Sequence, residues 1–400
     1  MKQVYIIDYI RTPIAKFQGG LSEVRADDLA AIVLKEIVKR NPQIPAEEIE
    51  DVILGCANQA GEDNRNVARM ASLLAELPIK IGGETVNRLC ASGMAAISNA
   101  YRAIAIGEGD FYIAGGVEQM TRAPYVLSKS AQPFGRDVQL FDSSFGWRFV
   151  NPKMKELYGV DGMGETAENL AEIYKISREA QDEFALLSQQ KATSAQNSGR
   201  LAQEIVNVEI PQKKGEPKIF SEDEFVKPDT TLDKLAKLRP AFKKEGGSVT
   251  AGNSSGLNDG AAAMILASED AVKKYNLKPL AKIISSAVVG VEPRIMGIGP
   301  VEATKKALSR ANLSLEDMDI IELNEAFAAQ ALSVLQELGI DAKDERLNPN
   351  GGAIALGHPL GMSGTRIVGT AALELQKKNK KYALCTLCIG VGQGYAMIIE

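Results

Sequence analysis

The feature that most constrains the fold is an alternation of strand-like and helix-like segments that occurs twice in the same order. The strand runs Val52–Gly55 and Ile320–Leu323 begin 268 residues apart, and the long helices expected from Cys90 and Gly361 begin 271 residues apart. Internal sequence identity is weak, so the regular spacing carries the inference. We therefore predict a duplicated α/β architecture with parallel strands.

Hydrophobic periodicity locates the expected elements of both copies. In the first copy, strands are expected at Val4–Tyr9, Val52–Gly55, Thr85–Leu89, Phe111–Ala114 and Ala261–Ala267, and helices at Ala26–Lys39 and from Cys90 to about Ile106. In the second copy, strands are expected at Lys282–Ser286, Ile320–Leu323, Tyr382–Ile389 and Tyr395–Ile399, and helices at Val301–Arg310 and Gly361–Gln376.

Residues 121–248 fit neither copy, because they are richer in charged and turn-forming residues. Their expected elements are helices at Glu165–Lys175 and Arg178–Asn197 and a hairpin that joins Ile205–Ile210 to Lys218–Phe220. We predict three parts. They are a discontinuous N-terminal half of residues 1–120 and 249–274, an inserted loop domain of residues 121–248, and a C-terminal half of residues 275–400.

Charge and hydropathy argue against several classes of function, although they leave a local basic patch open. Lys and Arg total 46 against 51 Asp and Glu, and the formal net charge of -5 gives no general attraction to nucleic acid or to an anionic membrane. No apolar run approaches the ~20 residues that span a bilayer. The N-terminus begins directly as a strand and neither end carries a sorting signal, so we expect a cytoplasmic protein with no nucleic-acid or membrane partner.

The chain has a single histidine, His358, in a run of glycines and small residues. Histidine is the only side chain whose unperturbed pKa lies near neutral pH, which makes it a common acid or base in catalysis. Glycines allow the backbone to approach closely and to adopt unusual dihedral angles, as reactive centres often require. The alternative is an inert histidine, but an inert surface histidine would not need this glycine setting.

Cys90 follows one expected strand and opens the helix of the first copy. A thiol at a helix N-terminus is near free N–H groups and the positive end of the helix dipole, which favour the thiolate and lower the pKa. Cys90 is therefore a candidate nucleophile, and the adjacent N–H groups could hold an oxyanion. The alternative is a buried small apolar residue. The duplication would place Cys90 near the histidine of the second copy.

The remaining cysteines divide into one candidate and two core residues. Cys388 lies at an expected strand end, where a thiol can act as the acid and base for a carbon acid. Cys385 and Cys56 are interpreted as core residues, and no metal site is predicted, because the pair at 385 and 388 has no second pair and the one histidine lies in a loop. The glycine run at 390–394 leads from strand to strand. Because no helix follows it to receive a pyrophosphate, it argues against a binding site for NAD or FAD.

Asn324 directly follows the expected strand Ile320–Leu323. An amide at this position could hold a catalytic water or a substrate oxygen. The alternative is a helix N-cap, a frequent role of asparagine between a strand and a helix.

These residues lie in motifs that resemble the signatures of the thiolase family. The motifs are NRLCASG at Cys90, NEAFA at Asn324, NPNGGAIALGHPLGMSG at His358, CIGVGQG at Cys388, and TAGNSSGLNDGAA. The similarity covers the whole chain in order and implies duplicated βαβαβαββ halves packed as a layered α-β-α-β-α core with an inserted loop domain. Within the family, the chain most resembles the 3-oxoadipyl-CoA (β-ketoadipyl-CoA) thiolases of aromatic and phenylacetate degradation, through CANQAGEDNRNVARMA, FGWRFVNPKMKELYGVDGMGETAEN and EPRIMGIGP.

The resemblance implies a role for each candidate. His358 deprotonates Cys90, which attacks the 3-oxo carbon of a 3-oxoacyl-CoA and becomes acylated, and Cys388 protonates the departing acetyl-CoA enolate. His358 and a water held by Asn324 stabilise the enolate oxygen, while the N–H groups of Cys90 and Gly390 hold the tetrahedral oxyanion. CoA then accepts the acyl group, and the reverse reaction is a Claisen condensation. No metal or prosthetic group is implied, since CoA and acetyl-CoA are substrates.

The resemblance also implies where CoA and the acyl group bind. CoA contacts are expected from the loop domain, Ser255, Lys227 and Met163, and the basic run Lys234–Lys244 is either a phosphate contact or a solvated face. Relatives specific for acetoacetyl-CoA have a histidine where this chain has Gly162, which counts against that short substrate. A dicarboxylate substrate needs a cation for its distal carboxylate. The candidates for this cation are Arg65, Arg148 and Arg294.

Other functions fit less well. A condensing ketosynthase uses two histidines with its cysteine, and this chain has one. A cysteine protease leaves Cys388 and the duplication unexplained, and a non-catalytic CoA or lipid carrier leaves Cys90, His358 and Cys388 without a use. Within the family, an acetoacetyl-CoA thiolase and a broad 3-ketoacyl-CoA thiolase are the alternatives. We expect a homo-oligomer, a dimer or a tetramer, because relatives usually form one.

Overall fold

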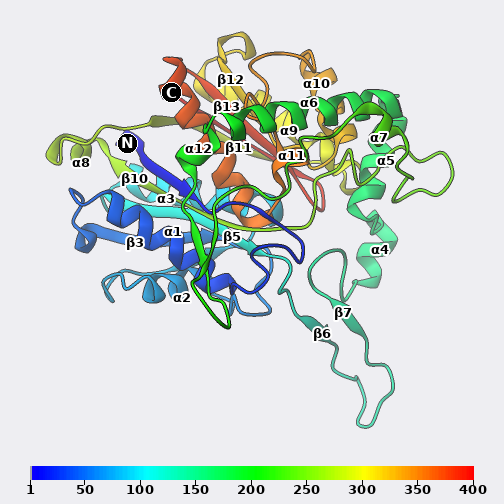
Figure 1. Cartoon of the computed structure of the whole chain (residues 1–400), viewed down its shortest axis with the longest axis horizontal. Helices are drawn as coiled ribbons and strands as arrows, with labels where there is room; N and C mark the ends of the chain where they lie inside the picture. Colours follow the sequence, from blue (N-terminus) through cyan, green and yellow to red (C-terminus); the bar gives the residue numbers. More distant parts are fainter. Residues whose placement is uncertain (1) are drawn as a thin grey trace.

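The computed structural model, which describes residues 2–400, contains a ten-stranded mixed sheet (Figure 1). Along the sheet the strands are β12 (Ile320–Leu323), β13 (Ala383–Ile389), β14 (Gln393–Ile399), β11 (Ala281–Gly290), β1 (Val4–Arg11), β10 (Asn258–Ser268), β5 (Phe111–Gln119), β3 (Ile49–Gly55) and β4 (Glu84–Val86). The short strand β2 (Ala15–Lys16) pairs with β10. β1 and β11 pair at only two positions, Tyr5 with Lys282 and Ile6 with Ala281, so the sheet has a narrow seam.

The two sides of this seam have the same topology. The order β1-β10-β5-β3 on one side matches β11-β14-β13-β12 on the other, and the first two neighbouring pairs are antiparallel and the third parallel in both. This confirms the predicted duplication. The expectation of parallel strands was wrong for most of the sheet. In each half one strand, β10 or β14, lies between two others and runs antiparallel to both.

Helices form three layers around the two halves of the sheet, as predicted. Apolar residues of α1 (Ala26–Arg40) and α2 (Val67–Leu74) pack on the outer face of the first half, and those of α9 (Gly299–Ala311) and α10 (Ala328–Leu338) on the outer face of the second (Figure 1). Between the halves, α3 (Ser92–Ile106) and α12 (Leu360–Lys378) share one buried cluster with both sets of strands.

Residues outside these layers form the loop region, which is the part of the chain between β5 and β10, and two short helices elsewhere in the chain. These are β6 (Tyr125–Leu127), β7 (Leu140–Asp142), α4 (Pro152–Tyr158), α5 (Met163–Ile173), α6 (Arg178–Asn197), β8 (Val208–Ile210), β9 (Lys218–Phe220), α7 (Leu232–Ala236), α8 (Glu269–Lys274) and α11 (Ala353–Leu356). The β8–β9 hairpin and α6 lie where predicted, whereas the hairpin β6–β7 was not anticipated. The predicted boundaries of the three parts stay a prediction.

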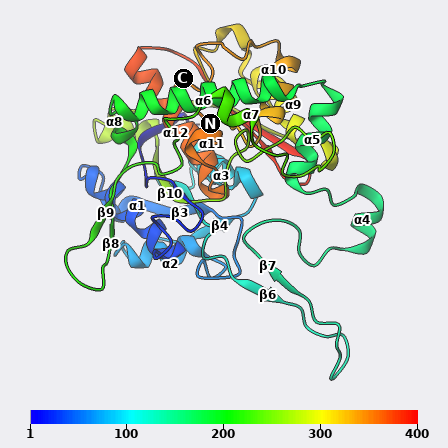
Figure 2. The same cartoon turned by 45° about the vertical axis from the view of Figure 1, so that its right-hand side comes forward.

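The hairpin β6–β7 projects from the body of the molecule in both views (Figures 1 and 2). It exposes large apolar side chains, among them Tyr125, Leu127, Phe134 and Leu140. Across residues 2–400, we find no helix with both the length and the apolar character that crossing a lipid bilayer requires.

A buried charge network ties the loop region to the sheet. The Arg11 guanidinium on β1 donates to both carboxylate oxygens of Asp223, at 2.7 and 2.8 Å, and to Glu204 at 2.7 Å. Arg200 donates to the other Glu204 oxygen at 3.0 Å. The side chains of Arg11, Asp223 and Glu204 are all fully buried, so each charge depends on its partners.

Replacing Arg11 with alanine is expected to lower the free energy of unfolding by about 3–5 kcal/mol, because it leaves two buried carboxylates short of a partner. Urea unfolding followed by circular dichroism measures the change. Lys35→Ala, which removes an exposed ion pair with Glu76, is the control and should change stability by less than about 1 kcal/mol. Equal losses of stability in the two variants would show that the buried network stabilises the fold no more than an exposed ion pair does.

Candidate active site

Cys90 lies where two cavities meet. One, of about 270 Å³, is also lined by His358, Cys388 and Ser255. The other, of about 290 Å³, is also lined by Glu118, Arg148 and Gly390. Four further residues line both cavities, namely Met120, Phe145, Met163 and Leu360. The structure therefore brings together, from both halves of the chain, the cysteines and the histidine singled out in the sequence.

Cys90 sits in a 3-10 turn, Leu89–Ala91, that leads directly into α3. Leu89 adopts a left-handed conformation with φ of 46°, which is unusual for a branched residue and turns the chain sharply before the nucleophile. Burial raises the pKa of the Cys90 thiol to about 11, although the N–H groups of Gly390 and of Cys90 itself act to lower it. The predicted lowering of this pKa was wrong, because the helix-end argument ignored the desolvation by the surrounding loops.

His358 is buried with one ring nitrogen engaged and the other free. Nδ1 lies 2.6 Å from Ser363 Oγ, and that hydroxyl donates to Pro359 O at 2.9 Å. A carbonyl can only accept, so the single hydroxyl hydrogen goes to Pro359 and Nδ1–H donates to Ser363. Nε2 is then unprotonated, and it has no partner within the described residues. Burial, assisted by the Arg366 charge, lowers the pKa of His358 to about 3, which keeps the ring neutral near neutral pH.

Backbone contacts between glycines hold the Cys90 and His358 segments together. A Cβ on Gly93 would lie 2.6 Å from Gly361 O, and one on Gly361 would lie 2.5 Å from Val117 O. A Cβ on Gly364 would lie 2.4 Å from Met94 N, so α3 and α12 approach each other closely at these glycines. Larger residues at these positions would push apart the two helices whose N-terminal ends carry the site.

Cys388 and Cys385 lie on β13 and face different surroundings. Cys388 lines the cavity with His358, and burial together with the nearby Cys90 raises the pKa of the Cys388 thiol. A raised pKa keeps Cys388 protonated near neutral pH. Cys385 packs in the cluster between the halves, with its sulfur 3.6 Å from Ile367 O, and Cys56 is buried beside Asn58. Both were predicted as core residues.

Asn324 is fully buried, and neither its amide nitrogen nor its amide oxygen has a partner within the described residues. It lines neither cavity that contains Cys90, although Ala326 and Phe327, which closely follow it, line the one with His358. It does not cap a helix, because the N-cap of α10 is Phe327. An unpaired buried amide is costly unless a ligand or water satisfies it. The alternative of a helix cap is therefore excluded.

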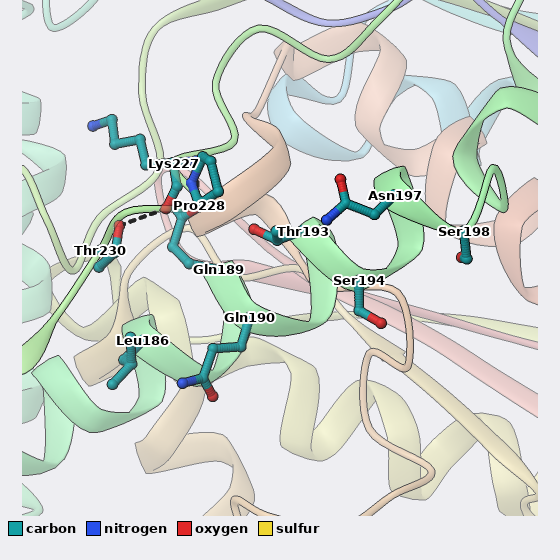
Figure 3. A pocket seen from close by; sticks show the side chains of 10 residues that line it. All are labelled: Leu186, Gln189, Gln190, Thr193, Ser194, Asn197, Ser198, Lys227, Pro228 and Thr230. Atoms are coloured by element: carbon teal, nitrogen blue, oxygen red, sulfur yellow. Dashed lines mark hydrogen bonds between the residues drawn. The ribbon is translucent and has the colours of Figure 1, made fainter.

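The predicted CoA contacts Ser255 and Lys227 line different cavities. Ser255 lines the cavity with His358, and its hydroxyl donates to Ala326 O at 3.0 Å. Lys227 lines a neighbouring cavity, and Figure 3 shows it on a loop beside Gln189 and Thr193 of α6. In the basic run, Lys234 pairs with Asp229 at 2.5 Å and Lys243 with Glu172 at 3.4 Å, so both of these charges are already matched.

The three arginines proposed for a distal carboxylate lie in different places. Arg148 lines the cavity with Cys90, where it is the only cation, and its one hydrogen bond in the described structure is to Ser143 O at 3.3 Å. Arg65 lies in the loop before α2, and Arg294 in the 3-10 helix that precedes α9. Neither Arg65 nor Arg294 lines a cavity that contains Cys90.

Three site residues were missed in the sequence. Asn258 accepts a hydrogen bond from His358 N at 2.9 Å, and Ser363 orients the ring as described. Glu118, on β5, accepts hydrogen bonds from three backbone N–H groups beside Cys90. The available signals were the charged residue that ends the apolar run FYIAGGVE and the Asn-Asp pair that begins β10. Within residues 2–400, no group of three or more His, Cys, Asp or Glu could hold a metal ion.

Comparison with known proteins gives matches over the whole chain. Residues 4–270 match the N-terminal domain of thiolases, and residues 277–400 match the C-terminal domain. A relative from Escherichia coli K12, named 3-oxoadipyl-CoA/3-oxo-5,6-dehydrosuberyl-CoA thiolase, is 59% identical over 400 residues and covers 100% of both chains.

Solved structures agree with these matches. The acetyl-CoA acetyltransferase of Bacillus anthracis superposes with a TM-score of 0.93 at 42% identity, covering 100% of this chain and 99% of its own. A human mitochondrial 3-ketoacyl-CoA thiolase in complex with CoA gives 0.91 at 42% identity, covering 100% and 98%. With these matches along its full length, the chain belongs to the thiolase family.

Proposed function

We propose that this thiolase cleaves 3-oxoadipyl-CoA with CoA, to give acetyl-CoA and succinyl-CoA through an acyl group carried on Cys90. The observation that carries the proposal is the pair of cavities that meet at Cys90. One contains His358 and Cys388, which supply proton transfer, and the other contains the Arg148 cation. The name of the relative from Escherichia coli supports the same substrate.

The first half-reaction transfers the acyl group to the enzyme. His358 Nε2 takes the proton from Cys90, and the thiolate attacks the 3-oxo carbon. The N–H groups of Cys90 and Gly390 hold the oxyanion of the tetrahedral intermediate. The bond between C2 and C3 then breaks, and its electron pair forms the acetyl-CoA enolate. The His358 N–H and a water held by Asn324 stabilise the enolate oxygen, and Cys388 donates a proton to C2.

The second half-reaction releases the product. Cys388, now a thiolate, takes the proton of the CoA thiol, and CoA attacks the thioester on Cys90. Cys90 leaves as a thiolate and is reprotonated by His358, so the enzyme returns to its starting state. Both sulfurs and the imidazole line one cavity, which is what these short proton transfers require.

CoA reaches Cys90 through the cavity on the Ser255 side. This cavity shares Ala251 with a neighbouring one that is lined by Lys227 and Lys234, so the two cavities adjoin, and bound CoA would extend across both. Lys227 forms no ion pair among the described residues and is the cation we propose for a CoA phosphate. Met163 lines both cavities and would contact the thioester end of the substrate.

The other cavity fits a longer acyl group that ends in a carboxylate. Gly162 lines it, and a Cβ added there would meet only the carboxyl group of Glu165, at 3.3 Å from Oε2, so the position leaves room that a histidine would fill. Arg148 has most of its donors free to form paired hydrogen bonds with a carboxylate. These features favour a dicarboxylic acyl group over acetoacetyl-CoA.

Arg148→Ala is expected to lower kcat/KM for 3-oxoadipyl-CoA by about 10- to 100-fold, the effect of losing about 1.5–3 kcal/mol of charged hydrogen bonding. The effect on acetoacetyl-CoA, which has no distal carboxylate, should be within about two-fold. Steady-state thiolysis measures kcat/KM for 3-oxoadipyl-CoA, acetoacetyl-CoA and a medium-chain 3-oxoacyl-CoA. The three values distinguish the proposed enzyme from a short-chain or broad-range thiolase.

Arg65→Ala and Arg294→Ala are matched controls, because they remove the same side chain outside the cavity. Both should retain the preference of the wild-type enzyme. An equal loss on both substrates in Arg148→Ala would contradict a carboxylate contact, and a selective loss in Arg65→Ala or Arg294→Ala would move the contact to that residue.

We also propose that the protein is a homo-oligomer, a dimer or a tetramer. The projecting hairpin β6–β7 exposes the apolar side chains Tyr125, Leu127 and Leu140, a surface that a second copy would cover. Light scattering coupled to size-exclusion chromatography measures the mass in solution, and a monomer at micromolar concentration would contradict the proposal.

A further inference from the structure

Glu118 is a buried carboxylate that connects three segments around the active site. Its side chain lies at the end of β5 and is 2% exposed. One oxygen accepts from Asn58 N at 2.9 Å, and the other accepts from Ala57 N at 3.0 Å and Gly361 N at 2.8 Å. No side-chain cation pairs with it in the described structure, so its charge is stabilised mainly by these backbone N–H groups, with a long contact of 4.0 Å from Cys56 Sγ to the first oxygen.

The contact with Gly361 links Glu118 to the histidine. Gly361 lies in the first turn of α12, three residues after His358, where backbone N–H groups have no partner within the helix. Glu118 satisfies one of these groups and its negative charge is favoured by the positive end of the helix dipole. Gly361 is also the residue whose backbone touches Gly93 and Val117, so a small shift there would move His358 relative to Cys90.

We propose that Glu118, as a carboxylate, is a positioning residue that fixes the His358 segment against Cys90. This inference rests on the roles proposed for Cys90 and His358. The three donors to Glu118 come from the loop after β3 and from α12, so one side chain of the N-terminal half sets the position of the base carried by the C-terminal half. The carboxylate of Glu118 only accepts hydrogen bonds. Protonation would remove its charge and add an O–H group, whose hydrogen would compete with the three N–H donors.

The charged and titratable groups around Glu118 determine how it responds to pH. Cys56 and Asp63 face it from the loop after β3, Cys90 from the 3-10 turn, and Arg148 lines the same cavity. Burial raises the pKa of Glu118 to about 7 against the lowering effect of its three N–H donors, and Asp63 raises it slightly. Burial also raises the pKa of Asp63 to about 6. The carboxylate of Glu118 is therefore present above about pH 7 and lost as the pH falls through this value.

The test uses Glu118→Gln, which keeps the shape and one acceptor, and Glu118→Leu, which removes both. Thiolysis of acetoacetyl-CoA, measured between about pH 5.5 and 9, gives kcat and KM without involving the distal carboxylate. In the wild type, kcat should fall as the pH decreases through about 7. Glu118→Gln should lack this fall and have a kcat about 10-fold lower at pH 8, and Glu118→Leu about 100-fold lower, with KM within about two-fold.

Two variants separate positioning from general structural support. Asp63→Asn should retain the acidic fall in kcat, which would assign that fall to Glu118. Glu168 makes a similar set of hydrogen bonds, in which it accepts from the N–H groups of Ser248 and Val249, on a segment that contains neither His358 nor Cys90. Glu168→Gln should lose stability to a similar extent as Glu118→Gln but keep a kcat within about two-fold of the wild type.

Three results would overturn the inference. They are an acidic fall that persists in Glu118→Gln, a kcat of Glu118→Leu within about two-fold of the wild type, and an equal loss of kcat in Glu168→Gln. Acylation of wild-type Cys90 by acetyl-CoA is measured on the same preparations. If that acyl group forms while the Glu118 variants behave as the wild type, only the positioning role fails. If it does not form, the proposed reaction itself fails.

Discussion

Cys90→Ala is expected to lower the rate of thiolysis by about a million-fold, the scale seen when a catalytic nucleophile is removed. The variant has no sulfur to carry the acyl group, and the only other thiol in the cavity, Cys388, has its pKa raised by burial. Mass spectrometry after incubation with acetyl-CoA should show an acetyl group on the wild-type peptide that contains Cys90 and none on the variant.

Cys385→Ala is the matched control, because it removes a buried thiol on the core side of β13. It should keep the acetyl group on Cys90 and most of the activity. An acetyl group on the Cys90→Ala variant would assign the nucleophile to another residue. A wild-type enzyme that binds acetyl-CoA without acylation would instead favour a CoA carrier.

Hydrophobic periodicity predicted the location of most core elements because their signals are local. Helix α6 and strand β12 lie at the predicted residues, and α12 differs by one or two residues at each end. Strand direction was predicted less well, because periodicity indicates which residues are buried but not whether neighbouring strands run parallel or antiparallel. β10 is separated from β5 by the inserted region, and no local pattern indicates that it runs antiparallel beside β5.

Two of the helices that were not predicted, α2 and α10, were missed for the same reason. α2 and α10 hold equivalent places in the two halves, on the outer faces of the sheet. Both are short, and α2 is bounded by loops in which Asn64 and Glu76 adopt positive φ. The repeat could have located α10 from α2, or the reverse, once either had been recognised, because duplicated units place equivalent helices at equivalent offsets.

The sequence identified Cys90, His358 and Cys388 but missed Glu118, Asn258 and Ser363, and it did not predict the electrostatics of the site. Cys90 and His358 stand out as a cysteine at a helix start and as a lone histidine among glycines. The pKa of Cys90 is raised because residues from many distant segments exclude water from it, and a local helix-dipole argument contains none of them. The tautomer of His358 likewise depends on Ser363 and Pro359, and its backbone depends on Asn258 from the other half.

Cys388→Ala is expected to lower the rate of thiolysis by about 10²- to 10⁴-fold, the usual contribution of a general acid or base. The variant lacks the thiol that protonates C2 of the acetyl-CoA enolate. Exchange of deuterium from heavy water into the methyl group of acetyl-CoA measures this step without cleavage of a carbon–carbon bond. The exchange should be lost in Cys388→Ala and kept in Cys385→Ala, which lies on the same strand with its sulfur against α12.

The same variant should still accept an acetyl group on Cys90. In that step the leaving group is the thiolate of CoA, whose ordinary thiol pKa of about 8.5 makes it stable without a proton donor, whereas an enolate carbon is far more basic. Cys388→Ala therefore separates the two sulfurs, since one carries the acyl group and the other moves the carbon-bound proton. Deuterium exchange that persists within a few-fold in this variant would assign the C2 proton to His358 or Cys90, the other two proton acceptors that the mechanism places in that cavity.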